Sequence, residues 1–193
     1  MTKKLWEASL YQKKNSILFS FENYISKKLN KKFNNNYQKI LDWSIKNSPE
    51  FWSYFWDFTK IKGIKSTKKI KKSKIFYKNL FLPNSKLNFA ENLLSKNNNE
   101  KAATFISEND FREERSWAKL NENTRNLAQF FKNKKIKQKD RIAAYMPNII
   151  ETVEAFIATT SVGAIWSSCS PDFGVRGVIE RFSQINPKLL FIT

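Results

Sequence analysis

Side chains that could bind a ligand or take part in a reaction gather in one short stretch, the turn S-P-D-F-G and the residues after it. Ser170 supplies a hydroxyl, Asp172 a carboxylate and Arg176 a guanidinium that could meet an anionic ligand. Pro171 stiffens the turn, and Phe173 adds an apolar side chain. A hydroxyl nucleophile needs an activating base beside it, and none is evident here. The stretch is therefore a candidate binding turn, and we expect no catalytic residue in the chain.

Histidine is absent from the sequence, and Cys169 is its one cysteine. The lack of histidine excludes Ser-His triads, imidazole acid–base chemistry and histidine metal ligands, and we expect no metal site. Cys169 has no histidine to activate it, so we expect a small buried residue at a strand end. A single cysteine forms no internal disulfide, and a reducing, cytoplasmic compartment is the default for such a chain.

The candidate turn belongs to a region in which apolar runs alternate with helical periodicity. The runs predict strands at 141–146, 164–168 and 188–193, with a helix that ends at Gly163 and another at 175–184 between them. This order with short connections is typical of a parallel sheet covered by helices. Such sheets usually bind ligands beyond the carboxyl ends of their strands. The turns at 147–148 and 168–174 are therefore the places to look for function.

Three side chains near these turns have ordinary structural roles as alternatives. Asn148, with Glu151 three residues later, matches a capping box for the first helix. Asp172 fits a cap for the helix that starts near Phe173, and a surface or capping role competes with anion binding for Arg176. Asp140 is expected to cap the turn before the first strand, and Ser167, Ser168 and Ser170 to form hydrogen bonds within their turn.

The first part of the chain is predicted to be mainly helical, with helices at 15–29, 37–46 and 50–59. The third begins at Ser48-Pro49-Glu50, which supplies a cap, an early proline and an acid in the first turn. It carries a dense group of aromatic residues, Phe51, Trp52, Tyr54, Phe55, Trp56 and Phe58. Such a group could stack nucleic-acid bases, but a helix wedged between two packed surfaces is the favoured interpretation.

A basic run and a hairpin follow these helices. The run at 63–74 could be an anion-binding patch, although a solvated loop is the favoured interpretation, and 75–78 is a candidate short strand. Asn88 and Glu91 predict a capped helix at 89–96, and 102–107 with 111–115 predicts a β-hairpin. Ser116 is expected to cap a helix at 117–132.

The formal net charge of +18 invites the hypothesis of nucleic-acid binding. Residues 1–100 carry 21 lysines, no arginine and 7 acids, whereas residues 101–193 carry 14 basic and 10 acidic residues. Base reading favours arginine, whose fork matches guanine. Lysine, asparagine, isoleucine and phenylalanine share A/T-rich codons, so genome composition explains the excess. We therefore expect no nucleic-acid partner.

These patterns predict an α/β chain with two parts. Residues 1–100 form a helical N-terminal segment, and residues 101–193 begin a doubly wound parallel sheet covered by helices. The sheet is expected to be partial, because the chain stops on its third strand. No stretch approaches the roughly 20 apolar residues of a membrane span, and the N-terminus lacks the hydrophobic run of an export signal. We expect a cytoplasmic protein without a membrane partner.

Several motifs carry a resemblance to a known family. They are P-N-I-x-E-x-V from Pro147, G-A-I-W-S-S-C-S-P-D-F-G-V-R-G-V at 163–178, L-W-E at 5–7, F-W-S-Y-F-W-D-F at 51–58 and L-N-F-A-E-N-L-L at 87–94. Together they resemble the acetoacetyl-CoA synthetases (acetoacetate–CoA ligases) of the AMP-forming acyl-CoA synthetase superfamily. The similarity runs from about residue 5 to the last residue. The run at 163–178 is specific, because the related acetyl-CoA synthetases have a glycine-rich turn there.

The resemblance implies a two-step ligase reaction. Acetoacetate attacks the α-phosphate of ATP to give an acyl-adenylate and pyrophosphate, and the CoA thiol then displaces AMP. It implies ATP, Mg²⁺ and CoA as cofactors of a full-length enzyme that serves ketone-body and lipid metabolism. It also implies that residues 1–100 match the N-terminal part of acetyl-CoA synthetases, and that the turn at Ser170, Pro171, Asp172 and Phe173, with Arg176, borders the acyl/CoA channel.

The motifs for ATP binding are expected to lie beyond Thr193. The chain has four glycines and neither of the glycine-rich phosphate-loop patterns. We therefore interpret it as the truncated N-terminal part of such a ligase, inactive alone and expected to bind none of the cofactors alone. The alternative hypothesis is a non-catalytic remnant or a basic interaction module. A Ser/Thr/Gly-rich run encoded after codon 193 would distinguish the two.

Overall fold

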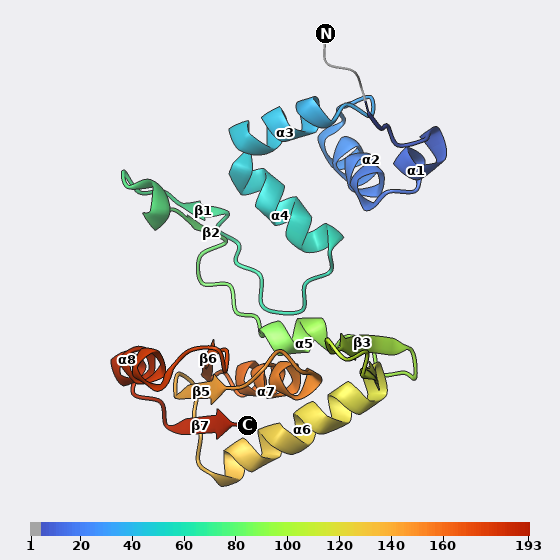
Figure 1. Cartoon of the computed structure of the whole chain (residues 1–193). Coiled ribbons are helices and arrows are strands. Elements are labelled where there is room, and N and C mark those ends of the chain that lie inside the picture. The colour runs from blue at the N-terminus through green and yellow to red at the C-terminus, as the bar shows by residue number, and fades with distance from the viewer. Residues whose placement is uncertain (1–4) are drawn as a thin grey trace. The chain divides into compact units, whose positions relative to one another are not determined.

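The computed structural model describes residues 5–193, which form two compact units (Figure 1). The first ends at Lys86 and the second comprises Leu87–Thr193. None of the helices in the described part is long and apolar enough to cross a membrane. The expectation that the chain starts without an export signal falls partly on residues 1–4, which lie outside the described residues.

The described residues of the first unit include four α-helices. They are α1 (Leu10–Lys14), α2 (Ile17–Leu29), α3 (Tyr37–Lys46) and α4 (Ser48–Phe58). The side chains of Ser9, Ser16 and Asn36 cap the first three by accepting backbone N–H bonds. Helix α4 begins after Asn47 without a side-chain cap, so the expectation that Ser48 caps it is wrong. Pro49 and Glu50 do lie in its first turn, as predicted.

The aromatic residues of α4 build the core of this unit against α2 and α3. Phe21 of α2 is 6% exposed, and its ring centroid lies 5.8, 5.9 and 5.1 Å from those of Phe51, Phe55 and Phe58. Trp43 of α3 lies 6.3 Å from Phe51. The edge-on contacts of Phe21 are the favoured geometry for aromatic pairs. The helix is therefore wedged between packed surfaces, as predicted.

The basic run leads into a small hairpin. Strand β1 (Ile70–Lys71) pairs antiparallel with β2 (Leu80–Phe81), and η1 (Phe76–Lys78) is a 3₁₀ turn between them. The prediction of a strand at 75–78 is therefore wrong. The backbone N–H of Lys78 donates to Ile75 O at 3.0 Å, so this segment turns the chain between the two strands.

The second unit starts with α5 (Phe89–Leu93), the hairpin β3 (Lys101–Ile106) and β4 (Arg112–Ser116), and α6 (Trp117–Asn133). The hairpin is antiparallel, as predicted, and Ser116 caps α6 by accepting from Lys119 N. Helix α5 is shorter than predicted. Its cap Asn88 also donates to Thr160 O and Ser161 O at 3.0 and 3.2 Å. This contact explains why the compact unit begins at Leu87, before the composition shift near residue 100.

The rest of the second unit is a three-stranded parallel sheet. It consists of β5 (Arg141–Tyr145), α7 (Ile150–Ser161), β6 (Ile165–Cys169), α8 (Val175–Ile185) and β7 (Leu189–Ile192). The spatial order is β6–β5–β7, and both pairs are parallel, as predicted. Gly163 ends the connection after α7 with φ +75°, which suits glycine.

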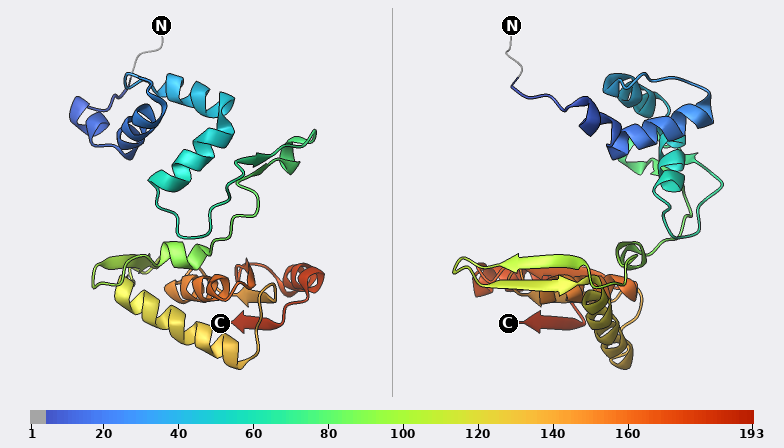
Figure 2. Two further views of the ribbon diagram at one scale, coloured as in Figure 1. Left: turned by 180° about the vertical axis from the view of Figure 1, so that it is seen from behind. Right: turned by 90° about the vertical axis from the view of Figure 1, so that its right-hand side faces the viewer.

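Helices cover both faces of this sheet (Figure 1 and Figure 2). Ile142 of the central strand faces α6 and α7 and packs with Phe131 and Ala158. Ala143, the next residue, faces α8 and packs with Phe182. Alternate residues of a strand point to opposite faces of the sheet. A central strand that is apolar on both faces is therefore typical of a doubly wound sheet, which helices cover on both sides.

Helix α7 does not start as the sequence predicted. Its N-cap is Ile149, which makes no side-chain cap bond, so the proposed capping box of Asn148 and Glu151 is wrong. The hydroxyl of Thr152 instead donates to Pro147 O at 2.7 Å and closes the turn after β5. The Glu151 carboxylate binds Arg115, 36 residues away, at 2.9 Å.

Candidate functional site

The turn after β6 is held together by its own polar atoms. Ser170 Oγ donates to Asp172 Oδ2 at 2.6 Å, and the backbone N–H of Phe173 donates to Ser170 O at 3.1 Å. Asp172 does not cap α8, because the N-cap of that helix is Gly174 and no side chain bonds to its first turn. The expected capping role of Asp172 is therefore wrong, and its carboxylate stabilises the turn that precedes the helix.

Phe173 and Arg176 lie at the outer surface of this turn and of α8. Phe173 is 39% exposed, and the guanidinium carbon of Arg181 lies 4.2 Å from the centroid of its ring. Arg176 Nε donates to Glu180 Oε1 at 2.8 Å across one helical turn, and the Arg176 side chain is 93% exposed. An ion pair this exposed contributes little to stability. Because the side chain is exposed, the Arg176 guanidinium is accessible to an anion.

Tyr145 connects the turn to the central strand. Its hydroxyl donates to the Pro171 carbonyl at 2.7 Å, and the Phe173 carbonyl lies 3.1 Å from the same oxygen. Tyr145 is the last residue of β5 and pairs in register with Cys169, the last residue of β6. The motifs alone did not indicate this residue, because its contact depends on the register of the two strands.

The second candidate turn, 147–148, starts at the same edge of the sheet. The backbone N–H of Met146 donates to Cys169 O at 3.3 Å, which aligns the ends of β5 and β6. Asn148 lines a cavity of about 240 Å³ together with residues of β3 and Val153 of α7. That cavity contains no residue of the Ser170–Phe173 turn. The two turns therefore share an edge of the sheet but border different surfaces.

A larger cavity lies between α6 and α7, beside the ends of β5 and β7. It measures about 410 Å³, and Asn123, Met146, Glu154 and Phe191 are among the residues that line it. The Glu154 carboxylate accepts hydrogen bonds from Arg115 Nε and Asn123 Nδ2, both at 2.8 Å. This acid is therefore engaged in a structural network.

The other residues considered from the sequence occupy structural positions. Cys169 is 5% exposed and packs with Ala143 and Phe182, as expected for a buried strand end. Asp140 accepts from Lys137 N at 2.6 Å, which confirms its role in the turn before β5. It also accepts from Lys188 Nζ at 2.8 Å. These bonds, that of Lys188 first, hold the pKa of the Asp140 carboxyl below its ordinary value.

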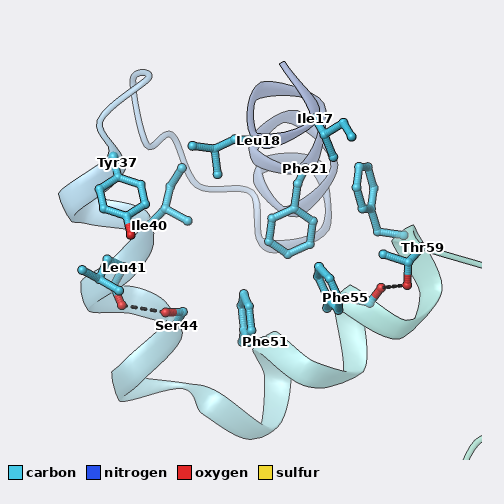
Figure 3. Close-up of a pocket in the computed structure, with 11 residues that line it drawn as sticks. Ile17, Leu18, Phe21, Tyr37, Ile40, Leu41, Ser44, Phe51, Phe55 and Thr59 are labelled. Carbon is cyan, nitrogen blue, oxygen red and sulfur yellow. Dashed lines mark hydrogen bonds between the residues drawn. The ribbon is translucent and has the colours of Figure 1, made fainter. Parts of the chain in front are cut away.

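The first unit contains an apolar cavity of about 370 Å³ among α2, α3 and α4 (Figure 3). Phe21, Phe51 and Phe55 point into it. Its serine and threonine hydroxyl groups are engaged locally, since Ser44 Oγ donates to Leu41 O and Thr59 Oγ1 to Phe55 O, both at 2.7 Å. The cavity is therefore lined mainly by apolar side chains, and its few polar groups do not form an arrangement that could catalyse a reaction.

Metal ligands do not gather among residues 5–193. Within that range, no group of three or more histidine, cysteine, aspartate and glutamate side chains could hold a metal ion. The sequence also lacks a glycine-rich phosphate loop. Among these residues, no set of side chains is therefore assigned to an ATP–Mg²⁺ site.

Comparison with known proteins identifies the protein family of the chain. The family model for the AMP-binding enzymes matches residues 92–193, which includes the whole parallel sheet and the candidate turn. The chain belongs to the AMP-binding enzyme family.

Several of its relatives within this class are acetoacetyl-CoA synthetases. The chain is 43% identical over 159 residues to the acetoacetyl-CoA synthetase of Xenopus tropicalis and 40% identical over 157 residues to that of Rhizobium meliloti. These matches cover 80% and 81% of this chain but 24% of each relative. The solved structure of acetoacetyl-CoA synthetase from Streptomyces lividans matches with a TM-score of 0.91 and 25% identity, over 99% of this chain and 30% of that one.

Proposed function

We propose that this chain forms part of an acetoacetate–CoA ligase, which converts acetoacetate, ATP and CoA into acetoacetyl-CoA, AMP and pyrophosphate. The observation that carries the proposal is the fold of the S-P-D-F-G turn. The turn leaves the carboxyl end of the parallel strand β6, at the edge where α/β sheets bind ligands. Identity above 40% to a synthetase of that name supports acetoacetate as the substrate.

Within this function, the Ser170–Phe173 turn and Arg176 border the path of the acyl group or of CoA. The Phe173 ring is partly exposed beside the Arg181 guanidinium. Arg176 presents a second guanidinium with 93% of its side chain exposed. Cationic groups near an exposed turn suit the phosphates of CoA. The turn contributes binding and shape, and no residue of this chain takes part in a bond-making step.

The chain alone is proposed to lack ligase activity. The sequence has neither glycine-rich phosphate-loop pattern, and the family resemblance assigns the catalytic lysine of adenylate formation to none of its residues. Purified chain incubated with acetoacetate, ATP, Mg²⁺ and CoA should release neither AMP nor pyrophosphate in an acetoacetate-dependent manner. Acetoacetate-dependent release of either product would overturn this part of the proposal and show that the chain carries its own catalytic groups.

The role of the turn is tested in a full-length acetoacetyl-CoA synthetase that carries the same S-P-D-F-G residues. Phe173→Ala should raise the KM for acetoacetate or for CoA while thermal stability stays nearly normal. Phe131→Ala is the matched control, because Phe131 is fully buried in the core on the opposite face of the sheet. It should lower stability and leave both KM values unchanged. If Phe173→Ala moves neither KM, the turn does not border the channel.

A further inference from the structure

We infer that Tyr145 is a positioning residue that fixes the backbone of the Ser170–Phe173 turn for ligand binding. The inference rests on the proposed function of that turn. The observation behind it is one phenolic hydroxyl within hydrogen-bonding distance of two carbonyls of the turn, at 2.7 Å from Pro171 O and 3.1 Å from Phe173 O.

The Tyr145 hydroxyl can donate only one proton. The shorter contact, to Pro171 O, is the better bond, and rotation about the phenolic C–O bond turns the same proton toward Phe173 O. The carbonyls lie on either side of Asp172. The hydroxyl therefore restrains the middle of the turn, whichever carbonyl it serves.

The turn needs such an external restraint. Its internal bonds join Ser170 to Asp172 and to Phe173, which are its own members. Helix α8 begins without a side-chain cap, and a Cβ built on its N-cap residue Gly174 would meet no atom within 4 Å. Tyr145, by contrast, belongs to the central strand, whose residues Ile142, Ala143 and Ala144 are fully buried.

The ring and the hydroxyl of Tyr145 have separable roles. The ring packs against the buried cluster of Ala143, Cys169 and Phe182. Tyr145→Phe keeps this packing and deletes only the hydrogen bond to the turn. The variant is therefore expected to fold, and its effect should be confined to the turn.

The first measurement uses the chain itself. Tyr145→Phe should accelerate hydrogen–deuterium exchange in the peptide that spans 170–174 by about fivefold, the value for loss of one typical hydrogen bond. Exchange in β5 and α7 should stay unchanged. Ser170→Ala is the control, since it removes the internal Ser170–Asp172 bond and leaves Tyr145 in place. Unchanged exchange at 170–174 in Tyr145→Phe overturns the inference.

The second measurement uses a full-length acetoacetyl-CoA synthetase that carries both this tyrosine and this turn. Tyr145→Phe should raise the KM for acetoacetate or CoA about fivefold, with kcat within about twofold and the melting temperature unchanged. A general structural role would instead lower the melting temperature and leave KM unaltered.

Combining this result with Phe173→Ala separates the two proposals. If Phe173→Ala raises a KM and Tyr145→Phe does not, the turn borders the channel but Tyr145 does not position it. If neither substitution moves a KM, the proposed role of the turn fails, and the inference about Tyr145 fails with it.

Discussion

Arg115 Nε lies 2.8 Å from Glu154 Oε1, and this buried ion pair joins strand β4 to helix α7. The side chains are 14% and 9% exposed, and the guanidinium also contacts Glu113 at 3.0 Å and Glu151 at 2.9 Å. Burial opposes the charge on Arg115, but the carboxylates, that of Glu154 foremost, outweigh it and raise the pKa of the guanidinium. The hairpin is thereby attached to the helix that flanks the candidate edge of the sheet.

Loss of the Arg115 guanidinium is predicted to destabilise the second unit strongly. Arg115→Met should lower the free energy of unfolding by about 3–5 kcal/mol, because Glu154 would stay buried without a cation. Arg112→Met is the control on the same strand. Its pair with Glu114 is exposed and should contribute less than about 1 kcal/mol. Urea unfolding combined with hydrogen exchange of α7 measures both.

A double variant distinguishes the unpaired charge from the lost attraction. Arg115→Met with Glu154→Gln removes both charges, and it should recover part of the stability that Arg115→Met loses. If the double variant is as unstable as the sum of the two single variants, the cost does not come from an uncompensated charge at Glu154.

Acid is predicted to weaken the contact between Asp140 and Lys188. The pKa of Asp140 is lower in the folded chain, so its contribution to stability is present above the unfolded-state pKa and is lost as the pH falls through the folded-state pKa. Asp140→Asn should therefore lower the melting temperature near pH 7. The difference from the wild type should shrink and vanish as the pH falls below the folded-state pKa of Asp140.

Scanning calorimetry over this pH range provides the test. Asp42→Asn is the control, because the Asp42 carboxylate is exposed and accepts from the neutral amide of Gln38. A difference in melting temperature between wild type and Asp140→Asn that grows as the pH falls would contradict the expected direction of the pH dependence.

Self-association is predicted from the edges of the parallel sheet. Among residues 5–193 the order β6–β5–β7 leaves one side of β7 without a strand partner, and Leu190 and Ile192 of this strand are 43% and 67% exposed. Exposed apolar edge strands pair with other chains, and lysine on the edge opposes this. The chain should aggregate on size-exclusion chromatography, and Leu190→Lys with Ile192→Lys should shift it toward monomer.

A substitution away from any strand edge provides the comparison. Ile17 of α2 is 79% exposed, so Ile17→Lys also replaces an apolar surface residue by a charge. If Ile17→Lys reduces aggregation as much as the double substitution in β7 does, general surface hydrophobicity is the cause and the edge is not.

The sequence predicted the order of elements better than their boundaries. The three parallel strands followed from apolar runs between Pro147, Gly163 and Pro187, where backbone chemistry limits the structure. The capping predictions for Glu151 and Asp172 failed because other partners hold these carboxylates. Glu151 binds Arg115 across 36 residues, and Asp172 accepts from Ser170 within the turn. For Glu151, the local pattern contained no information about its distant partner Arg115.

The candidate site shows the same limit. The turn at 170–173 was identified from its place after a predicted strand, but its contact with Tyr145 depends on the pairing of Tyr145 with Cys169. Hydrophobic periodicity predicts that a strand exists and leaves its register open. Positioning contacts across two strands therefore require the three-dimensional structure.

Replacement of Thr124 by valine is predicted to stabilise the second unit. Thr124 lies on α6 and is 3% exposed, and its hydroxyl oxygen has no hydrogen-bond partner among the described residues. A buried polar group without a partner costs about 1–3 kcal/mol, and threonine and valine have similar helix propensities. Thr124→Val should therefore raise the free energy of unfolding by about 1 kcal/mol.

Thr159 offers a matched control for this prediction. It is fully buried on α7, and its hydroxyl donates to Ala155 O at 2.7 Å. Thr159→Val replaces the same group by the same methyl, but it removes a bond that is present, so it should leave stability unchanged or lower it by up to about 1 kcal/mol. The two melting temperatures should therefore move apart. Equal increases in both variants would show that the added apolar surface stabilises the unit and that the unpaired hydroxyl of Thr124 carries no cost.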